Sequence, residues 1–285
     1  MMATVNNSTS AIQQQLSTLF SPESGGDIVF HSSDNVLFYV HQKHIEAYAE
    51  GFPLAKHTTT SSTNSETETI SLTETSSTLE LLFQFMRPQN PPELDGLNFA
   101  QLMELANASE KYVAYFARGY CAFYMKEYIS TNTRAVFDYA VEHGHKNLLY
   151  DLAPLMVLEP LEELAFRLPH DVLVAWSIYH SNFIQTLSQF ITICRIAPKH
   201  STVDSGSGTL PWHVRMHEVK EEIVLDPRKL SQFGTLILQP NADRKKVCEC
   251  DLCKDFKLWR LTMCNLIKKM PDIKTIARNG RTQTQ

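Results

Sequence analysis

Long apolar runs are missing from this 285-residue sequence. A helix that crosses a membrane needs about 20 consecutive apolar residues. The longest candidate, residues 148–166, is interrupted by Asp151, Pro154, Glu159 and Pro160. The stretch MMATVNNSTSAIQQQ has neither the basic start nor the apolar core of a secretory signal peptide. We therefore expect an intracellular protein, cytoplasmic or nuclear, with no membrane partner.

Signatures of catalysis are missing as well. The sequence has no P-loop, no glycine-rich dinucleotide turn and no nucleophile elbow. The Ser/Gly run at residues 205–208 lacks the lysine and the preceding strand that phosphate binding requires, so it predicts a linker. These absences predict a protein that is not an enzyme and needs no cofactor. The rival interpretation, an enzyme of unfamiliar type, requires a deep pocket with convergent titratable groups.

Cysteine is scarce, with six residues, and an intracellular location favours free thiols or metal ligands over disulfides. Cys250 and Cys253 form a C-x-x-C pair that can hold two corners of a tetrahedral zinc ion. Cys264 lies roughly 16 Å further along a continuous helix, too far to share that ion. Ordinary reduced cysteines at the start of a helix are the alternative to structural zinc. Candidates for the remaining ligands are Cys248, Cys194, His200, His213 and His217.

Charge is distributed unevenly along the chain. Residues 241–285 contain 11 Lys/Arg and 5 Asp/Glu, a net charge of +6, whereas the other residues carry a net charge of −11. A basic segment can approach nucleic acid or an acidic surface. The plainer interpretation is a helix with a solvated basic face, and it makes nucleic acid the less favoured partner.

The first half of the chain alternates between strand and helix signals. Residues 28–30 and 36–40 are β-branched and aromatic, and the polar turn between them predicts a hairpin. Residues 41–48 predict a short helix and residues 70–72 a third strand. Leu79, Leu82, Phe83 and Met86 then follow at helical spacing.

The rest of the chain predicts helices. Six aromatic residues between positions 112 and 124 lie at spacings that favour core packing over a nucleic-acid stacking surface. Apolar residues from Leu252 to Met270 predict one final helix. The aromatic residues are Tyr112, Tyr115, Phe116, Tyr120, Phe123 and Tyr124.

The order of these signals resembles the BTB/POZ family. The resemblance covers residues 25–128 and includes Asp27 at the first strand, Val40-His41 at the end of the second, and the helix LELLFQFMRP ending at Pro88. Here Met86-Arg87 stands where the family usually has an aromatic residue. Many dimeric members carry a basic residue directly after the histidine, where this chain has Gln42 and then Lys43.

The resemblance implies an α+β fold, in which a small sheet flanked by helices is followed by a mostly α-helical region. The division we expect is a polar disordered lead-in (1–24), a BTB/POZ domain (25–128), a helical extension (129–194), a linker (195–210) and a basic helical region (211–285). The last two helical regions are similar to fungal BTB proteins, which carry two C-x-x-C pairs. Here residues 191–194 take the place of the first pair and retain only Cys194.

The resemblance also implies a function in protein–protein interaction. Family members self-associate as homodimers or act as adaptors, and some bind a cullin-type scaffold so that a recruited target receives ubiquitin. Asp27 and His41 are expected to support the scaffold rather than catalysis. The alternative function is a transcription-associated regulator that uses the basic segment 241–285 to contact nucleic acid.

Overall fold

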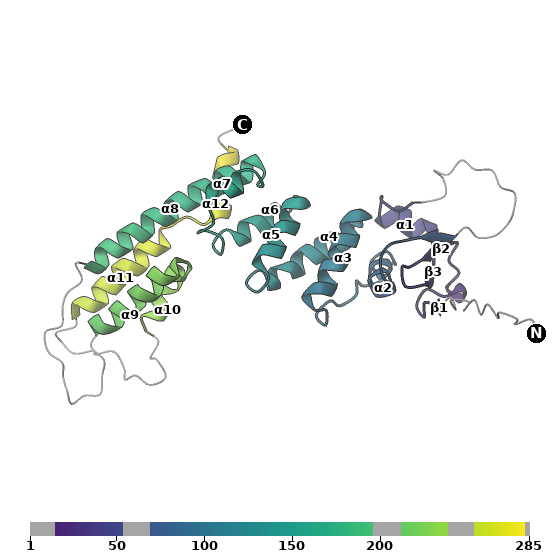
Figure 1. The fold of residues 1–285 in the computed structure, drawn as a ribbon, viewed down its shortest axis with the longest axis horizontal. Helices are drawn as coiled ribbons and strands as arrows, with labels where there is room; N and C mark the ends of the chain where they lie inside the picture. The colour runs from purple at the N-terminus through teal and green to yellow at the C-terminus, as the bar shows by residue number, and fades with distance from the viewer. Residues whose placement is uncertain (1–14, 54–68, 196–211, 239–253, 283–285) are drawn as a thin grey trace, which may run out of the picture. The chain divides into compact units, whose positions relative to one another are not determined.

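The structure is a computed structural model that describes residues 15–53, 69–195, 212–238 and 254–282 (Figure 1). The chain divides into two compact units, Met1–Thr131 and Asn132–Gln285. The first contains a small four-stranded sheet with helices, and the described part of the second is helical. The predicted combination of a small sheet and mostly helical structure is therefore confirmed.

A β-hairpin forms the centre of the first unit. β2 (Ile28–His31) and β3 (Val36–Val40) pair antiparallel, with Phe30 opposite Phe38, as the sequence predicts. Every second residue of β3 is buried, because strand side chains alternate between the two faces of a sheet. β4 (Thr69–Ser71) adds in parallel to β2, which gives the strand order β1-β3-β2-β4.

Residues 15–24 correct the prediction of a disordered lead-in. β1 (Gln15–Leu16) pairs in parallel with β3, and the 3₁₀ turn η1 (Pro22–Ser24) follows it. Phe20 is only 3% exposed. The polar composition is misleading here because strand pairing uses backbone groups, which every sequence provides. Residues 1–14 lie outside the described residues.

Five phenylalanines form the core beneath the sheet. Phe83 lies on α2 (Ser76–Gln84), and its ring centroid is 5.3 to 5.8 Å from those of the four others. Asp34, in the hairpin turn, fixes the start of α2 because its carboxylate accepts hydrogen bonds from the backbone N–H and the hydroxyl of Ser76. The other four phenylalanines are Phe20, Phe30, Phe38 and Phe52.

Two further helices complete the first unit. α3 (Phe99–Lys111) begins with a capping box, in which Asn98 and Gln101 exchange hydrogen bonds between side chain and backbone. Val113 takes a φ of 50°, a left-handed conformation that is costly for a β-branched residue and that turns the chain into α4 (Tyr115–Tyr124). α1 (Gln42–Tyr48) follows β3, and the 3₁₀ turn η3 (Met125–Tyr128) follows α4.

A half-buried network ties the C-terminal end of α3 to the segment between β4 and α2. The Tyr112 hydroxyl and the Lys111 ammonium both donate to the carboxylate of Glu74, the latter over 2.6 Å. Burial works to raise the pKa of Glu74, but these hydrogen bonds outweigh it and hold that pKa below its ordinary value. Burial and the neighbouring carboxylate raise the pKa of Tyr112, so its hydroxyl remains protonated as the donor.

We expect Glu74→Gln to lower the free energy of unfolding by about 1–3 kcal/mol near neutral pH, because two donors lose a charged acceptor. The folded state binds the Glu74 proton less readily than the unfolded state. The contribution is therefore complete above the ordinary glutamate pKa of 4.5 and is lost as the pH falls through the lower folded value. Urea titrations across this pH range should show the two proteins converging at low pH. Glu142→Gln, at an exposed position of α5, is the matched control. A stability difference between wild type and Glu74→Gln that stays the same at every pH would contradict this prediction.

The second unit contains nine described helical segments. The longest, α8 (His170–Arg195), contacts α6, α7, α9, α11 and α12. The others are α5 (Thr133–Glu142), α6 (Lys146–Leu152), α7 (Leu161–Ala165), α9 (Trp212–Leu225), η4 (Pro227–Gln232), α10 (Phe233–Leu236), α11 (Lys254–Lys268) and α12 (Ile273–Thr282).

The helical regions predicted at 129–194 and 211–285 form one unit rather than two. Phe190 of α8 packs on Phe233 of α10, which packs in turn on Trp259 of α11, with ring centroids 5.2 and 5.9 Å apart. α8 and α11 lie side by side in Figure 1. The two regions join because each has an apolar face that needs cover. Residues 196–210 of the predicted linker lie outside the described residues.

The helix predicted as far as Met270 is α11, but the prediction that it is the final helix is wrong, because α12 follows it. α11 ends at Lys268, and α12 begins after Pro271. Asp272 caps α12, since its carboxylate accepts hydrogen bonds from the backbone N–H groups of Lys274 and Thr275. Both signals, a proline and a following Asp cap, are present in the sequence.

Candidate functional site

The predicted zinc ligands are only partly visible. Cys248, Cys250, Cys253 and His200 lie outside the described residues. Cys194 is buried near the end of α8, and burial raises the pKa of its thiol to about 11, with Lys220 acting in the opposite direction. Such a thiol is protonated at neutral pH, whereas zinc binds the thiolate. His217 is exposed on α9, and the described residues hold no group of three or more metal-ligating side chains. Structural zinc stays a prediction.

The basic segment is likewise only partly described. Lys268 and Lys269 are exposed at the end of α11, and Lys274 of α12 forms an ion pair with Asp151. Lys245 and Lys246 lie outside the described residues. Contact with nucleic acid stays the less favoured alternative.

An exposed aromatic face is the feature of the first unit that sequence reasoning missed. Phe116 and Phe123 of α4 are each 63% exposed, and Tyr115 is also exposed. Phe116, Tyr120 and Phe123 follow one another at spacings of four and three residues, so they share one side of the helix. The prediction that these aromatic residues pack in the core is wrong for Tyr115, Phe116 and Phe123, because helical spacing shows which residues share a face but not whether that face is covered.

This face continues into a hollow of about 660 Å³, here called the aromatic groove. One wall comes from α4 and the other from α1, where the ring of Tyr48 lies 5.8 Å from that of Phe116. Phe85 and Tyr120 meet edge to face at 5.5 Å. The groove is defined by Tyr48, Phe85, Arg87, Pro88, Gln89, Asn90, Pro91, Phe116 and Tyr120.

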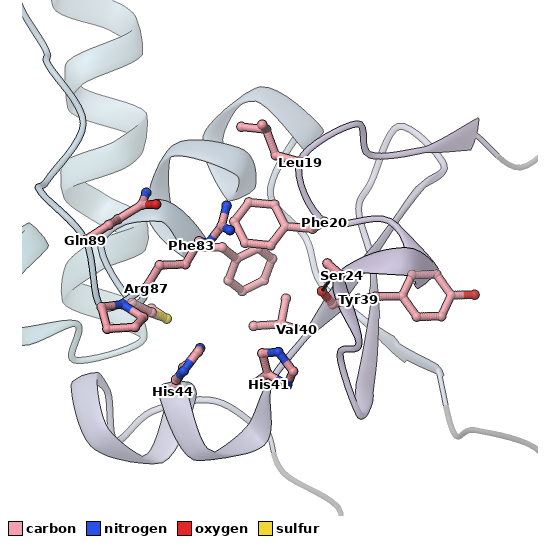
Figure 2. A pocket seen from close by; sticks show the side chains of 12 residues that line it. Leu19, Phe20, Ser24, Tyr39, Val40, His41, His44, Phe83, Arg87 and Gln89 are labelled. Carbon is pink, nitrogen blue, oxygen red and sulfur yellow. Dashed lines mark hydrogen bonds between the residues drawn. The ribbon is translucent and has the colours of Figure 1, made fainter.

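A second hollow of about 200 Å³, here called the cationic pocket, adjoins the segment after α2. His41 and His44 lie at the start of α1 with ring centroids 5.0 Å apart, and both line the pocket with Arg87 (Figure 2). The Arg87 guanidinium lies 5.5 Å from the centre of the Phe20 ring. The apolar lining comes from Leu19, Phe20, Val40, Phe83 and Met86.

The electrostatics of the cationic pocket show in His44. Its pKa lies below the ordinary value, first because the ring is partly buried. Nearby positive charge from His41, Lys43 and Arg87 lowers it further. The carboxylate of Asp27 acts in the opposite direction and is the smallest contribution. These surroundings therefore disfavour the protonated form of His44 as long as no further negative charge enters the pocket.

Asp27 has the scaffold role expected of it. Its carboxylate accepts a hydrogen bond of 2.6 Å from the backbone N–H of Gln42, at the first turn of α1. The Gln42 side chain donates to Glu46. The side chain after His41 is thus neutral, while Arg87 brings positive charge to the same end of α1.

Comparisons with protein-family models, with curated proteins and with solved structures give no match for this chain. Across the described residues, no helix has both the length and the apolar character to span a bilayer.

Proposed function

We propose that this chain is a non-catalytic protein–protein interaction module whose first unit docks a partner at the aromatic groove. The observation that carries the proposal is the exposed aromatic face of α4, which leads into the groove that α1, α4 and the segment 87–91 line. Large exposed apolar patches on soluble proteins mark interaction sites.

The energetics favour docking by burial. Covering an exposed phenylalanine side chain stabilises a complex by about 1.5–3 kcal/mol. Aromatic side chains are enriched among the residues that dominate binding energy, particularly where they line a pocket. Phe116 combines both properties, because it is 63% exposed and forms part of the groove wall.

The resemblance to BTB/POZ domains supports the same function. The first unit has the hairpin, short helix, third strand and following helices in the order that the resemblance implies. One form of the function is an adaptor, in which the first unit binds a cullin-type scaffold and the second recruits a protein for ubiquitin transfer. The other form is self-association as a homodimer.

The function is tested with Phe116→Asp, which places a charge in the groove at an exposed position that folding does not require. Full-length protein is immobilised, and the retained proteins are identified by mass spectrometry and then purified for affinity measurement. We expect affinity for a groove partner to fall by about thirtyfold or more, the loss typical of a dominant interface residue. Sedimentation of the full-length protein tests a second copy as the partner.

Phe166→Asp is the matched control. Phe166 is 93% exposed in the second unit and lies outside the groove. Retained proteins and sedimentation behaviour that are the same for wild type, Phe116→Asp and Phe166→Asp would overturn the proposed function.

A further inference from the structure

The aromatic groove and the cationic pocket share a wall. Arg87, Pro88 and Gln89 line both of them. The face of α1 is also shared, since His41 and His44 reach the pocket and Tyr48, one turn beyond His44, reaches the groove. A ligand that fills the groove therefore lies directly beside a positively charged hollow.

The positive charge of the pocket is not neutralised by the described residues. No carboxylate among them forms an ion pair with Arg87, whose guanidinium lies against the Phe20 ring instead. Asp27, whose carboxylate acts on His44, accepts a hydrogen bond from the Gln42 backbone N–H. The charged and titratable groups around the pocket include His41, Lys43 and His44 at the start of α1, Arg87 from the segment after α2, Tyr39 of β3, and Asp27 directly before β2.

We infer that the two hollows form one recognition site for an acidic peptide segment, with an apolar or aromatic anchor in the groove and an Asp or Glu carboxylate in the cationic pocket. This inference rests on the proposed function and names the chemistry of the partner. Charge complementarity selects the carboxylate, because an arginine and two histidines line the hollow together with apolar side chains.

The wall of three residues that separates the groove from the pocket limits the spacing between the anchor and the acidic residue of the peptide. Three consecutive residues extend over about 10 Å at most, and a bound extended peptide advances at about 3.3 Å per residue. The acidic residue should therefore lie within about three positions of the anchor. A volume of about 200 Å³ has room for one acidic side chain.

Binding of this carboxylate is coupled to a proton. Burial is the first cause of the low pKa of His44 and the positive neighbours are the second. A negative charge in the pocket offsets the second cause and thereby raises the pKa of His44 in the complex. The bound state then takes up protons that the free state does not hold, and affinity increases as the pH falls. A rise of one pKa unit gives up to about a tenfold gain in affinity.

The experiment uses a phage-displayed library of random twelve-residue peptides selected on the full-length protein at about pH 6. Enriched peptides are synthesised and their affinities are measured at about pH 6 and about pH 8. The variants are Phe116→Asp for the groove, and Arg87→Met and His44→Gln for the pocket. Arg134→Met is the matched control, because its guanidinium also lies over a phenylalanine ring, 5.8 Å from the centroid of Phe137 in the second unit. Melting temperatures of all variants identify any that fail to fold.

We expect peptides with an aromatic or large apolar residue within three positions of Asp or Glu. Arg87→Met should weaken them by about tenfold or more, Arg134→Met should leave them unchanged, and His44→Gln should flatten the pH dependence. Peptides that bind in the groove but contain no Asp or Glu, or whose affinity is unchanged by Arg87→Met, would overturn this inference and leave the proposed function standing. Enrichment that Phe116→Asp does not reduce would overturn both.

Discussion

Replacing Phe83 by alanine is expected to remove about 3–5 kcal/mol from the stability of the first unit. The Phe83 side chain is fully buried, and its ring contacts four others, from β2, β3 and the segments around residues 20 and 52. Domain stabilities are about 5–15 kcal/mol, so the loss brings the unit close to unfolding. Peptides from β2, β3 and α2 should lose their protection against hydrogen exchange.

Phe123→Ala provides the matched control for this substitution. It removes the same atoms from a position that is 63% exposed, so the change in stability should stay within about 0.5 kcal/mol. Equal hydrogen-exchange protection in Phe83→Ala and Phe123→Ala would show that the five rings do not form the core.

The second large effect is expected in the second unit, from Phe233→Ala. Phe233 is 1% exposed, and its ring connects Phe190 of α8 with Trp259 of α11. Its removal opens a cavity between three helices and should cost about 3–5 kcal/mol. All three tryptophans of the chain, Trp176, Trp212 and Trp259, belong to residues 132–285. Tryptophan fluorescence during urea unfolding therefore reports the change in this unit.

Phe166→Ala serves as the control, because Phe166 is 93% exposed in the same unit. Its unfolding midpoint should match that of the wild type, whereas the midpoint of Phe233→Ala should fall clearly. An unshifted midpoint for Phe233→Ala would mean that α8, α10 and α11 are not held together by these rings.

A buried arginine in the second unit could not be foreseen from the sequence. Arg215 of α9 is 4% exposed, yet it pairs with Glu218 and Glu222 and donates to the backbone carbonyl of Leu236. Its i,i+3 partner is visible in the sequence, but the carbonyl lies 21 residues away. The two glutamates belong to the same helix, whereas the tertiary structure supplies the Leu236 carbonyl that completes the partners of this buried charge.

Local patterns were sufficient for the secondary structure of most elements. The alternation of Val36, Phe38 and Val40 predicts β3, and the spacing of Leu79, Leu82 and Phe83 predicts α2, because these periods follow from backbone geometry alone. The sequence also contains the helix break at Pro271 and the cap at Asp272, although the prediction of one final helix did not use them. β1 could not be predicted from local patterns, because its pairing depends on the free edge of β3 rather than on its own side chains.

The hairpin β2–β3, most helices and the apolar side of each of these helices follow from the amino-acid order, since they depend on residues close together along the chain. Which apolar sides are covered depends on tertiary packing, and that of α4 stays exposed. Tertiary packing also brings His41 and His44 to one hollow with Arg87, more than 40 residues further along the chain. Contacts between distant segments depend on how whole elements pack, and no local period of the sequence encodes that packing.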